Sequence, residues 1–130
     1  ELLRMVEQHT VNEVMRRRGK LMPFGVGVSK ANEYFIAGIE EPPDPVNALN
    51  YAILALQNFA REGKISFAAT CFATYSKDPS LPSLMVMIIE DSSGTAIHCK
   101  RQYQQTSSGW TFGDMTASLD QPVVFVPMDG

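Results

Sequence analysis

The sequence predicts an α+β fold, an antiparallel β-sheet of about five to seven strands with two main helices packed on it. One long segment has helical apolar spacing between start and stop residues, and several short β-type runs are separated by turn residues. The 130 residues fit a single domain, 1–130. The predicted order is a helix, a hairpin, a second helix and then four or so strands (α-β-β-α-β-β-β-β), and we expect both helices on one face of the sheet.

Composition limits the classes of function. With 45% hydrophobic and 19% charged residues the chain is expected to fold, and a net charge of −3 argues against nucleic-acid binding. No apolar run approaches the ~20 residues that cross a bilayer, so we expect no membrane partner. The two cysteines, Cys71 and Cys99, do not make a disulfide framework, which predicts a cytoplasmic location.

The first predicted helix covers residues 2–18. Its apolar positions recur at helical spacing, and Gly19 is placed to end it. The basic run Arg16–Lys20 has two readings, an anion site or cations that stabilise the negative end of the helix, and we favour the second. The positions that recur at helical spacing in this predicted helix are Leu3, Val6, Thr10 and Val14, widened by Leu2, Met5, Val11 and Met15.

A hairpin follows, with strands at Phe24–Ser29 and Tyr34–Ile39. Gly25 and Gly27 raise the question of a phosphate-binding loop, but Lys30 stands where the third glycine of that motif belongs. Close packing of the backbone is the favoured role of these glycines and of Gly38.

The central helix is predicted between Asp44 and Gly63. Asp44 can cap its first turn, Pro45 suits the first helical position, and Gly63 suits the left-handed residue that ends a helix. The acidic lead Glu40–Asp44 could hold a divalent cation, but a charged helix entrance is favoured and no metal site is predicted. The apolar stripe comprises Val46, Leu49, Ala52, Ile53, Leu56, Phe59 and Ala60.

The rest of the chain reads as strands separated by turns rich in Gly, Pro, Asp and Ser. The second of these strands is apolar almost throughout, as in a central strand covered on both sides. The predicted strands are Ile65–Tyr75, Leu84–Glu90, Thr95–Gln104, Trp110–Ala117 and Val123–Val126.

Catalytic candidates are few. His98 and Cys99 are neighbours, but adjacent residues of a strand point to opposite faces, which leaves Cys71 with His98 across strands. Both cysteines have apolar neighbours and are expected to be buried structural thiols. His9 and His98 stand apart from other metal ligands, so we expect neither a metal nor a cofactor.

The aromatic residues Tyr103, Trp110 and Phe112 lie on two predicted strands joined by a polar turn. On an open face of the sheet they would be large, stiff anchors for a protein partner or ligand. The alternative is that they fill the core beneath a helix.

The pattern of short segments also resembles a family of small, uncharacterised bacterial proteins over roughly residues 2–103. The resemblance is carried by Met22-Pro23-Phe24-Gly25, Pro43-Asp44-Pro45, Arg61-Glu62-Gly63-Lys64-Ile65 and the acidic turn Glu90-Asp91. It implies the same α+β fold and assigns no active-site residues. Gln104–Gly130 lies outside the resemblance.

These observations lead us to expect a cytoplasmic, non-enzymatic domain that binds a protein partner or itself, as a homodimer through its sheet. A second hypothesis is a small-molecule sensor with a pocket between helices and sheet, for which the seven methionines would supply an adaptable lining. A third, ranked last, is a hydrolase that uses Cys71 or His98.

Overall fold

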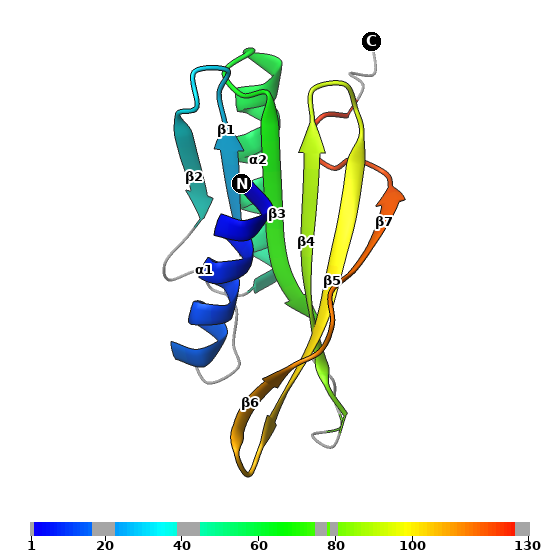
Figure 1. The fold of residues 1–130 in the computed structure, drawn as a ribbon. Helices are drawn as coiled ribbons and strands as arrows, with labels where there is room; N and C mark the ends of the chain where they lie inside the picture. The colour runs from blue at the N-terminus through cyan, green and yellow to red at the C-terminus, as the bar shows by residue number, and fades with distance from the viewer. Residues whose placement is uncertain (1, 17–22, 39–44, 75–77, 79–80, 127–130) are drawn as a thin grey trace.

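The computed structural model describes residues 2–16, 23–38, 45–74, 78 and 81–126 (Figure 1). All strand pairs are antiparallel, and the sheet has the order β2-β1-β3-β4-β5-β6, with β7 also paired to β5. The α+β prediction is therefore confirmed. The elements are α1 (Leu2–Arg16), β1 (Phe24–Val28), β2 (Tyr34–Gly38), α2 (Pro45–Arg61), β3 (Phe67–Thr74), β4 (Ser83–Asp91), β5 (Ala96–Thr106), β6 (Gly109–Phe112) and β7 (Thr116–Asp120).

The two helices cover opposite faces of the sheet, so the prediction that they share one face is wrong. Val6 of α1 packs in one buried cluster with Ala69, whereas Leu56 of α2 packs in another with Ala68. Ala68 and Ala69 are neighbours on β3, and neighbouring strand residues point to opposite faces. Figure 1 shows the same arrangement, with α1 in front of the strands and α2 behind them.

Local signals place α2 as predicted. Pro45 begins the helix. Ala52 and Leu56 of the predicted stripe are fully buried, and so is Ala48, which the predicted stripe did not include. Gly63 has a φ of 71°. The N–H of Lys64 donates to the Phe59 carbonyl (2.9 Å) and that of Gly63 to the Ala60 carbonyl (3.1 Å), which satisfies two carbonyls of the last turn. The proposed cap Asp44, like the acidic lead and Arg17–Lys20, lies outside the described residues.

Gly25 and Gly27 let α2 lie directly on β1. A Cβ atom at Gly25 would be 2.5 Å from Leu56 Cδ1, and one at Gly27 would be 2.8 Å from Ile65 Cγ2. Neither position has room for a larger side chain without movement of the helix or of Ile65. The predicted close packing is confirmed at these two glycines.

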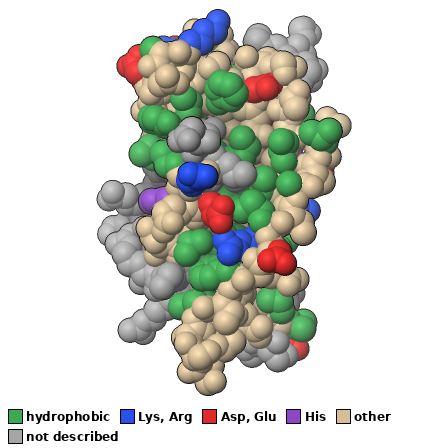
Figure 2. All heavy atoms as spheres, in the orientation of Figure 1, with side chains coloured by type: hydrophobic (Ala, Val, Ile, Leu, Met, Phe, Trp, Pro, Cys, Tyr) green, Lys and Arg blue, Asp and Glu red, His purple; other side chains and the backbone are tan. Residues whose placement is uncertain are grey.

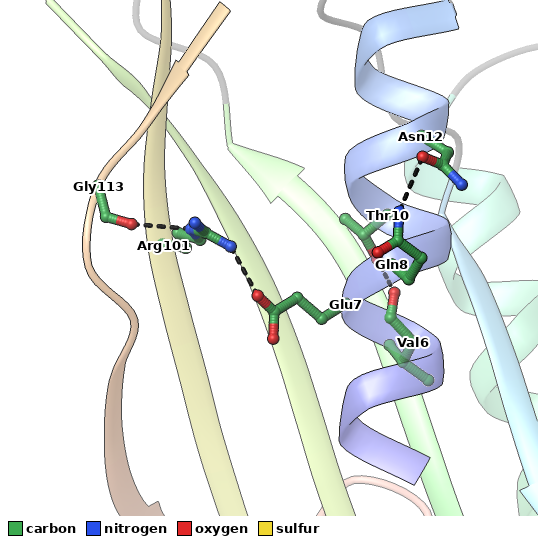
Figure 3. A network of polar contacts seen from close by, with 7 residues as sticks. All are labelled: Val6, Glu7, Gln8, Thr10, Asn12, Arg101 and Gly113. Carbon is green, nitrogen blue, oxygen red and sulfur yellow. Dashed lines mark hydrogen bonds and ion pairs between the residues drawn. The ribbon is translucent and has the colours of Figure 1, made fainter. Parts of the chain in front are cut away.

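Helix α1 is held on the other face by buried and polar contacts. Val6 and Thr10 are fully buried, and the Thr10 hydroxyl donates to the Val6 carbonyl (2.7 Å) within the helix. Arg101 of β5 donates from Nη1 to Glu7 Oε1 (2.6 Å) and from Nε to the Gly113 carbonyl (2.7 Å), as Figure 3 shows. Arg101 thus joins α1 to the segment between β6 and β7, at the edge of the sheet.

The predicted strand Trp110–Ala117 is two strands, β6 and β7, which lie along the same side of β5. Tyr103 pairs with Phe112 and Lys100 pairs with Thr116. Between these pairs, the two residues 101–102 of β5 face the three residues 113–115. One extra residue of this kind is a β-bulge, and it interrupts the edge of the sheet.

The predicted strand Val123–Val126 is also wrong, because this segment pairs with no strand of the described structure. Val124 is buried with Leu56 and Ala68, and Val123 packs beside Ile88. The segment therefore crosses the α2 side of the sheet next to the helix and covers the part of the sheet that α2 leaves open.

We expect Gly25→Ala to lower the free energy of unfolding by about 1–3 kcal/mol, because the new methyl group would overlap Leu56. Urea denaturation measures the change. Gly113→Ala is the matched control, since its Cβ would meet nothing closer than 3.7 Å. Equal stability of the two variants would contradict the close approach of α2 to β1.

Candidate functional site

The structure separates the two candidate catalytic residues. Cys71 lies directly opposite Met87 and packs with it in the buried layer under α1. His98 lies opposite Ile88, one residue further along β4 and therefore on the other face, where its Nε2 is 2.9 Å from the Gln121 carbonyl oxygen. Cys71 and His98 do not meet, and His98 and Cys99 point to opposite faces as predicted.

Both cysteines are buried and unpaired. Burial raises the pKa of the Cys71 thiol far above its ordinary value, and burial also raises the pKa of Cys99. A thiol acts as a nucleophile only as the thiolate, so neither environment activates one. Among the described residues, no group of three or more His, Cys, Asp or Glu side chains could hold a metal ion.

The predicted aromatic residues lie together at the end of the sheet where β5 meets β6. Tyr103 is buried against Met85, and its ring centroid is 6.1 Å from that of Trp110 and 6.4 Å from that of Phe112. The Arg101 guanidinium lies 5.4 Å from the Phe112 ring centroid. Tyr103 is therefore a core residue among strands, whereas Trp110 and Phe112 are half-buried, and their role in binding stays a prediction.

Glu90, near the end of β4, is part of the acidic turn noted in the sequence but was not a candidate site residue. Its side chain is 2% exposed. Its Oε1 accepts hydrogen bonds from the N–H groups of Val124 (2.9 Å) and Phe125 (2.8 Å), and its Oε2 accepts one from Val123 (3.2 Å). Three consecutive backbone N–H groups thus converge on one carboxyl group. The sequence shows only an acidic residue that ends an apolar strand.

An open hollow of about 560 Å³ lies beside this segment. It is bounded by the last turn of α2, by the turn between β4 and β5, and by residues 121–126. The hydrogen bond from the Ser93 hydroxyl lowers the pKa of Asp91 in that turn. The lining is more polar than the Met-rich and aromatic pocket expected from the sequence, and comprises Ala60, Arg61, Ser92, Ser93, Gly94, Gln121, Pro122, Val124, Phe125 and Val126.

An apolar row crosses the α1 side of the sheet from one edge to the other. Paired residues of neighbouring strands share a face, which makes the row continuous over β2, β1, β3, β4, β5 and β7. We call this set the apolar row: Ile36, Val26, Ala69, Ile89, Ile97 and Leu119.

The apolar row is buried on β1 and β3 and most exposed at its two ends. Val26 and Ala69 are buried, whereas Ile36 is 79% and Leu119 is 77% exposed. Figure 2 shows this face of the molecule, with hydrophobic side chains on its left and on its right. Among the described residues, Ile36 and Leu119 are the most exposed of the large hydrophobic side chains.

Comparison with known proteins finds no matching family model, no matching curated protein and no matching solved structure. The resemblance to small bacterial proteins therefore stays a prediction. In the part of the chain that the structure describes, no helix is both long and apolar enough to cross a membrane.

We expect Glu90→Gln to lower the free energy of unfolding by about 2–4 kcal/mol. The amide keeps one acceptor oxygen and turns an NH₂ group towards backbone donors, so buried N–H groups lose their partners. Urea denaturation gives the stability, and hydrogen exchange of Val123–Phe125 gives the local effect. Glu62→Gln is the control, because Glu62 forms only an exposed ion pair with Lys64. Equal losses in both variants would argue against the role assigned to Glu90.

Proposed function

We propose that the chain is a non-enzymatic protein-binding domain that associates through its sheet, in the first place with a second copy of itself. The observation that supports this is the apolar row, whose exposed ends Ile36 and Leu119 lie at opposite edges of the sheet. Exposed apolar surface that continues a buried core is typical of interaction sites. The buried, unpaired Cys71 and Cys99 support a reducing, cytoplasmic location.

The energetic argument concerns the ends of the row. Fully burying an Ile or Leu side chain stabilises a complex by about 1.5–3 kcal/mol before the costs of association. Two such side chains that are each more than three-quarters exposed are therefore a substantial source of binding free energy. On this face Glu7 and Arg101 already pair with each other, so their charges compensate each other when the face is covered.

We expect light scattering coupled to size-exclusion chromatography to show a mass that rises with concentration towards twice that of the chain. The double variant Ile36→Lys/Leu119→Lys should remain monomeric, because it places charge at both exposed ends of the row, whichever end forms the contact. Leu54→Lys is the control, since Leu54 is 57% exposed but lies on α2, away from the row. A wild-type protein that stays strictly monomeric up to about 1 mM would rule out self-association.

The second candidate function is a small-molecule sensor, and the hollow of about 560 Å³ favours it. Its size lies in the range of ligand sites, about 300–1,000 Å³. Arg61 and the hydroxyl groups of Ser92 and Ser93 supply polar groups, while Phe125 and Val126 supply apolar surface. Val124 and Phe125, which form one wall of the hollow, are held in place by their hydrogen bonds to Glu90.

In a thermal-shift screen of metabolites, we expect a ligand of this hollow at about 100 times its Kd to raise the melting temperature of the wild type by several degrees. Ser92→Trp, which fills the hollow, should abolish the shift. Ser107→Trp places the same side chain on the exposed turn between β5 and β6 and should retain it. Shifts that survive Ser92→Trp would place the ligand elsewhere.

A further inference from the structure

The two edges of the sheet differ in how well they are protected against pairing with another strand. One edge is the bulged pair β6 and β7, which ends in the charged residue Asp120. The other edge is β2, whose sequence Tyr34-Phe35-Ile36-Ala37-Gly38 has no charge, no proline and an unbroken register with β1. Charges and bulges are the usual devices that keep edge strands from pairing, and β2 has neither.

The backbone of β2 shows which hydrogen-bonding groups face outward. The Ser29 N–H donates to the Glu33 carbonyl (2.9 Å), so the pair that closes the hairpin is hydrogen-bonded. Hydrogen-bonded and non-hydrogen-bonded pairs alternate along antiparallel strands. Phe35 and Ala37 therefore exchange hydrogen bonds with β1, while Tyr34, Ile36 and Gly38 direct their N–H and C=O groups to the open edge.

A second contact agrees with this assignment. The Val28 carbonyl accepts a hydrogen bond from the Ser66 N–H (2.8 Å), on the side of β1 that faces β3. Val28 is paired with Tyr34, so the groups of Tyr34 must point the opposite way, out of the sheet.

Half-exposed apolar side chains flank the β2 edge on both faces. On the α1 side, Tyr34 is 52% exposed and Ile36 borders an apolar groove of about 160 Å³ that Met5 also lines. On the α2 side, the ring centroids of Phe35 and Phe59 are 5.4 Å apart. Tyr51 of α2 is also half-exposed.

We propose that two copies of this chain pair antiparallel through β2, with a two-fold axis perpendicular to the sheet at Ile36. This inference rests on the proposed self-association and names its interface. The three outward-facing residues of each strand exchange about six hydrogen bonds, with Ile36 opposite Ile36 of the second copy and Tyr34 opposite Gly38.

The proposed pairing also explains the exposed apolar groups at this edge. Directly opposite residues of an antiparallel pair share a face, so both Ile36 side chains lie on the α1 side and cover each other. Both α1 helices then flank one apolar trough in which each copy contributes Met5, Val26 and Ile36. The contact uses the same patch on both copies, as a two-fold interface requires.

The first experiment locates the interface by cross-linking. Ile36→Cys treated with a short bis-maleimide should give a covalent dimer, because the two new thiols face each other, while native Cys71 and Cys99 are buried. Leu119→Cys is the matched control at the opposite edge, with almost the same exposure, and should stay uncrosslinked. A covalent dimer from Leu119→Cys that equals or exceeds the one from Ile36→Cys overturns the β2 interface.

The second experiment tests the hydrogen-bond ladder. Ile36→Pro removes an outward N–H without touching the bonds to β1, a position where an edge strand accepts proline. Because of the two-fold symmetry two hydrogen bonds are lost, and the dimer Kd should rise at least about 30-fold. Ile36→Val keeps the N–H, the β-branch and most of the apolar contact, and should raise the Kd several-fold less than Ile36→Pro.

The outcomes distinguish this inference from the proposed function. A wild-type dimer that is unaffected by Ile36→Pro overturns the β2 interface and leaves self-association standing. A wild-type protein that is monomeric at all concentrations overturns both. Circular dichroism confirms that the proline variant is folded, and if it is not, the cross-linking of Ile36→Cys against Leu119→Cys still decides the question.

Discussion

The burial of β3 and β4 on both faces is the constraint on which the other elements depend. Small and apolar residues occupy every position in the middle of these strands, so each face needs its own cover. Helix α1 covers one face over Cys71 and Met87, and α2 covers the other over Ala68. Gly25 and Gly27 of β1 have no side chains on the face that α2 covers, so Leu56 packs directly against the β1 backbone.

Neither helix is wide enough to finish its layer, and the two faces are completed in different ways. On the α2 side, the segment Val123–Phe125 fills the remaining space. Its N–H groups donate to the carboxyl group of Glu90 instead of to the carbonyl groups of a neighbouring strand. Gln57 of α2 donates to the Val123 carbonyl (2.8 Å) and ties the segment to the helix. A buried acid is stable here because backbone donors satisfy it.

On the α1 side no such segment is present among the described residues, and the apolar row ends in exposed side chains at both edges. One edge is closed to pairing by the bulge opposite residues 101–102, where Arg101 binds Gly113 and Glu7. The other edge, β2, keeps a flat apolar strand with outward-facing backbone groups. The asymmetry between the two edges is therefore the property on which the proposed interaction function rests.

Local patterns in the sequence predicted both helices and most of the strands, because the causes of these elements are local. Pro45 and Gly63 mark the ends of α2 through backbone conformations that need no distant partner. Successive side chains of a strand point to alternate faces, so the sequence also shows which residues of β3 and of β4 share a face. The same patterns indicated that Gly25 and Gly27 serve packing rather than phosphate binding. For the candidate site, they selected Tyr103, Trp110 and Phe112 as a group but could not tell that Tyr103 is buried.

Only the tertiary structure decided which layer covers each face. Periodicity in the sequence shows that a face is apolar, but not whether a helix, a loop or another molecule lies on it. The placement of α1 and α2 on opposite faces therefore had no local signal in the sequence. The separation of Cys71 from His98 had none either. Val123–Val126 has β-type residues, yet it is held by a residue more than thirty positions away, because three hydrogen bonds to Glu90 outweigh local preference.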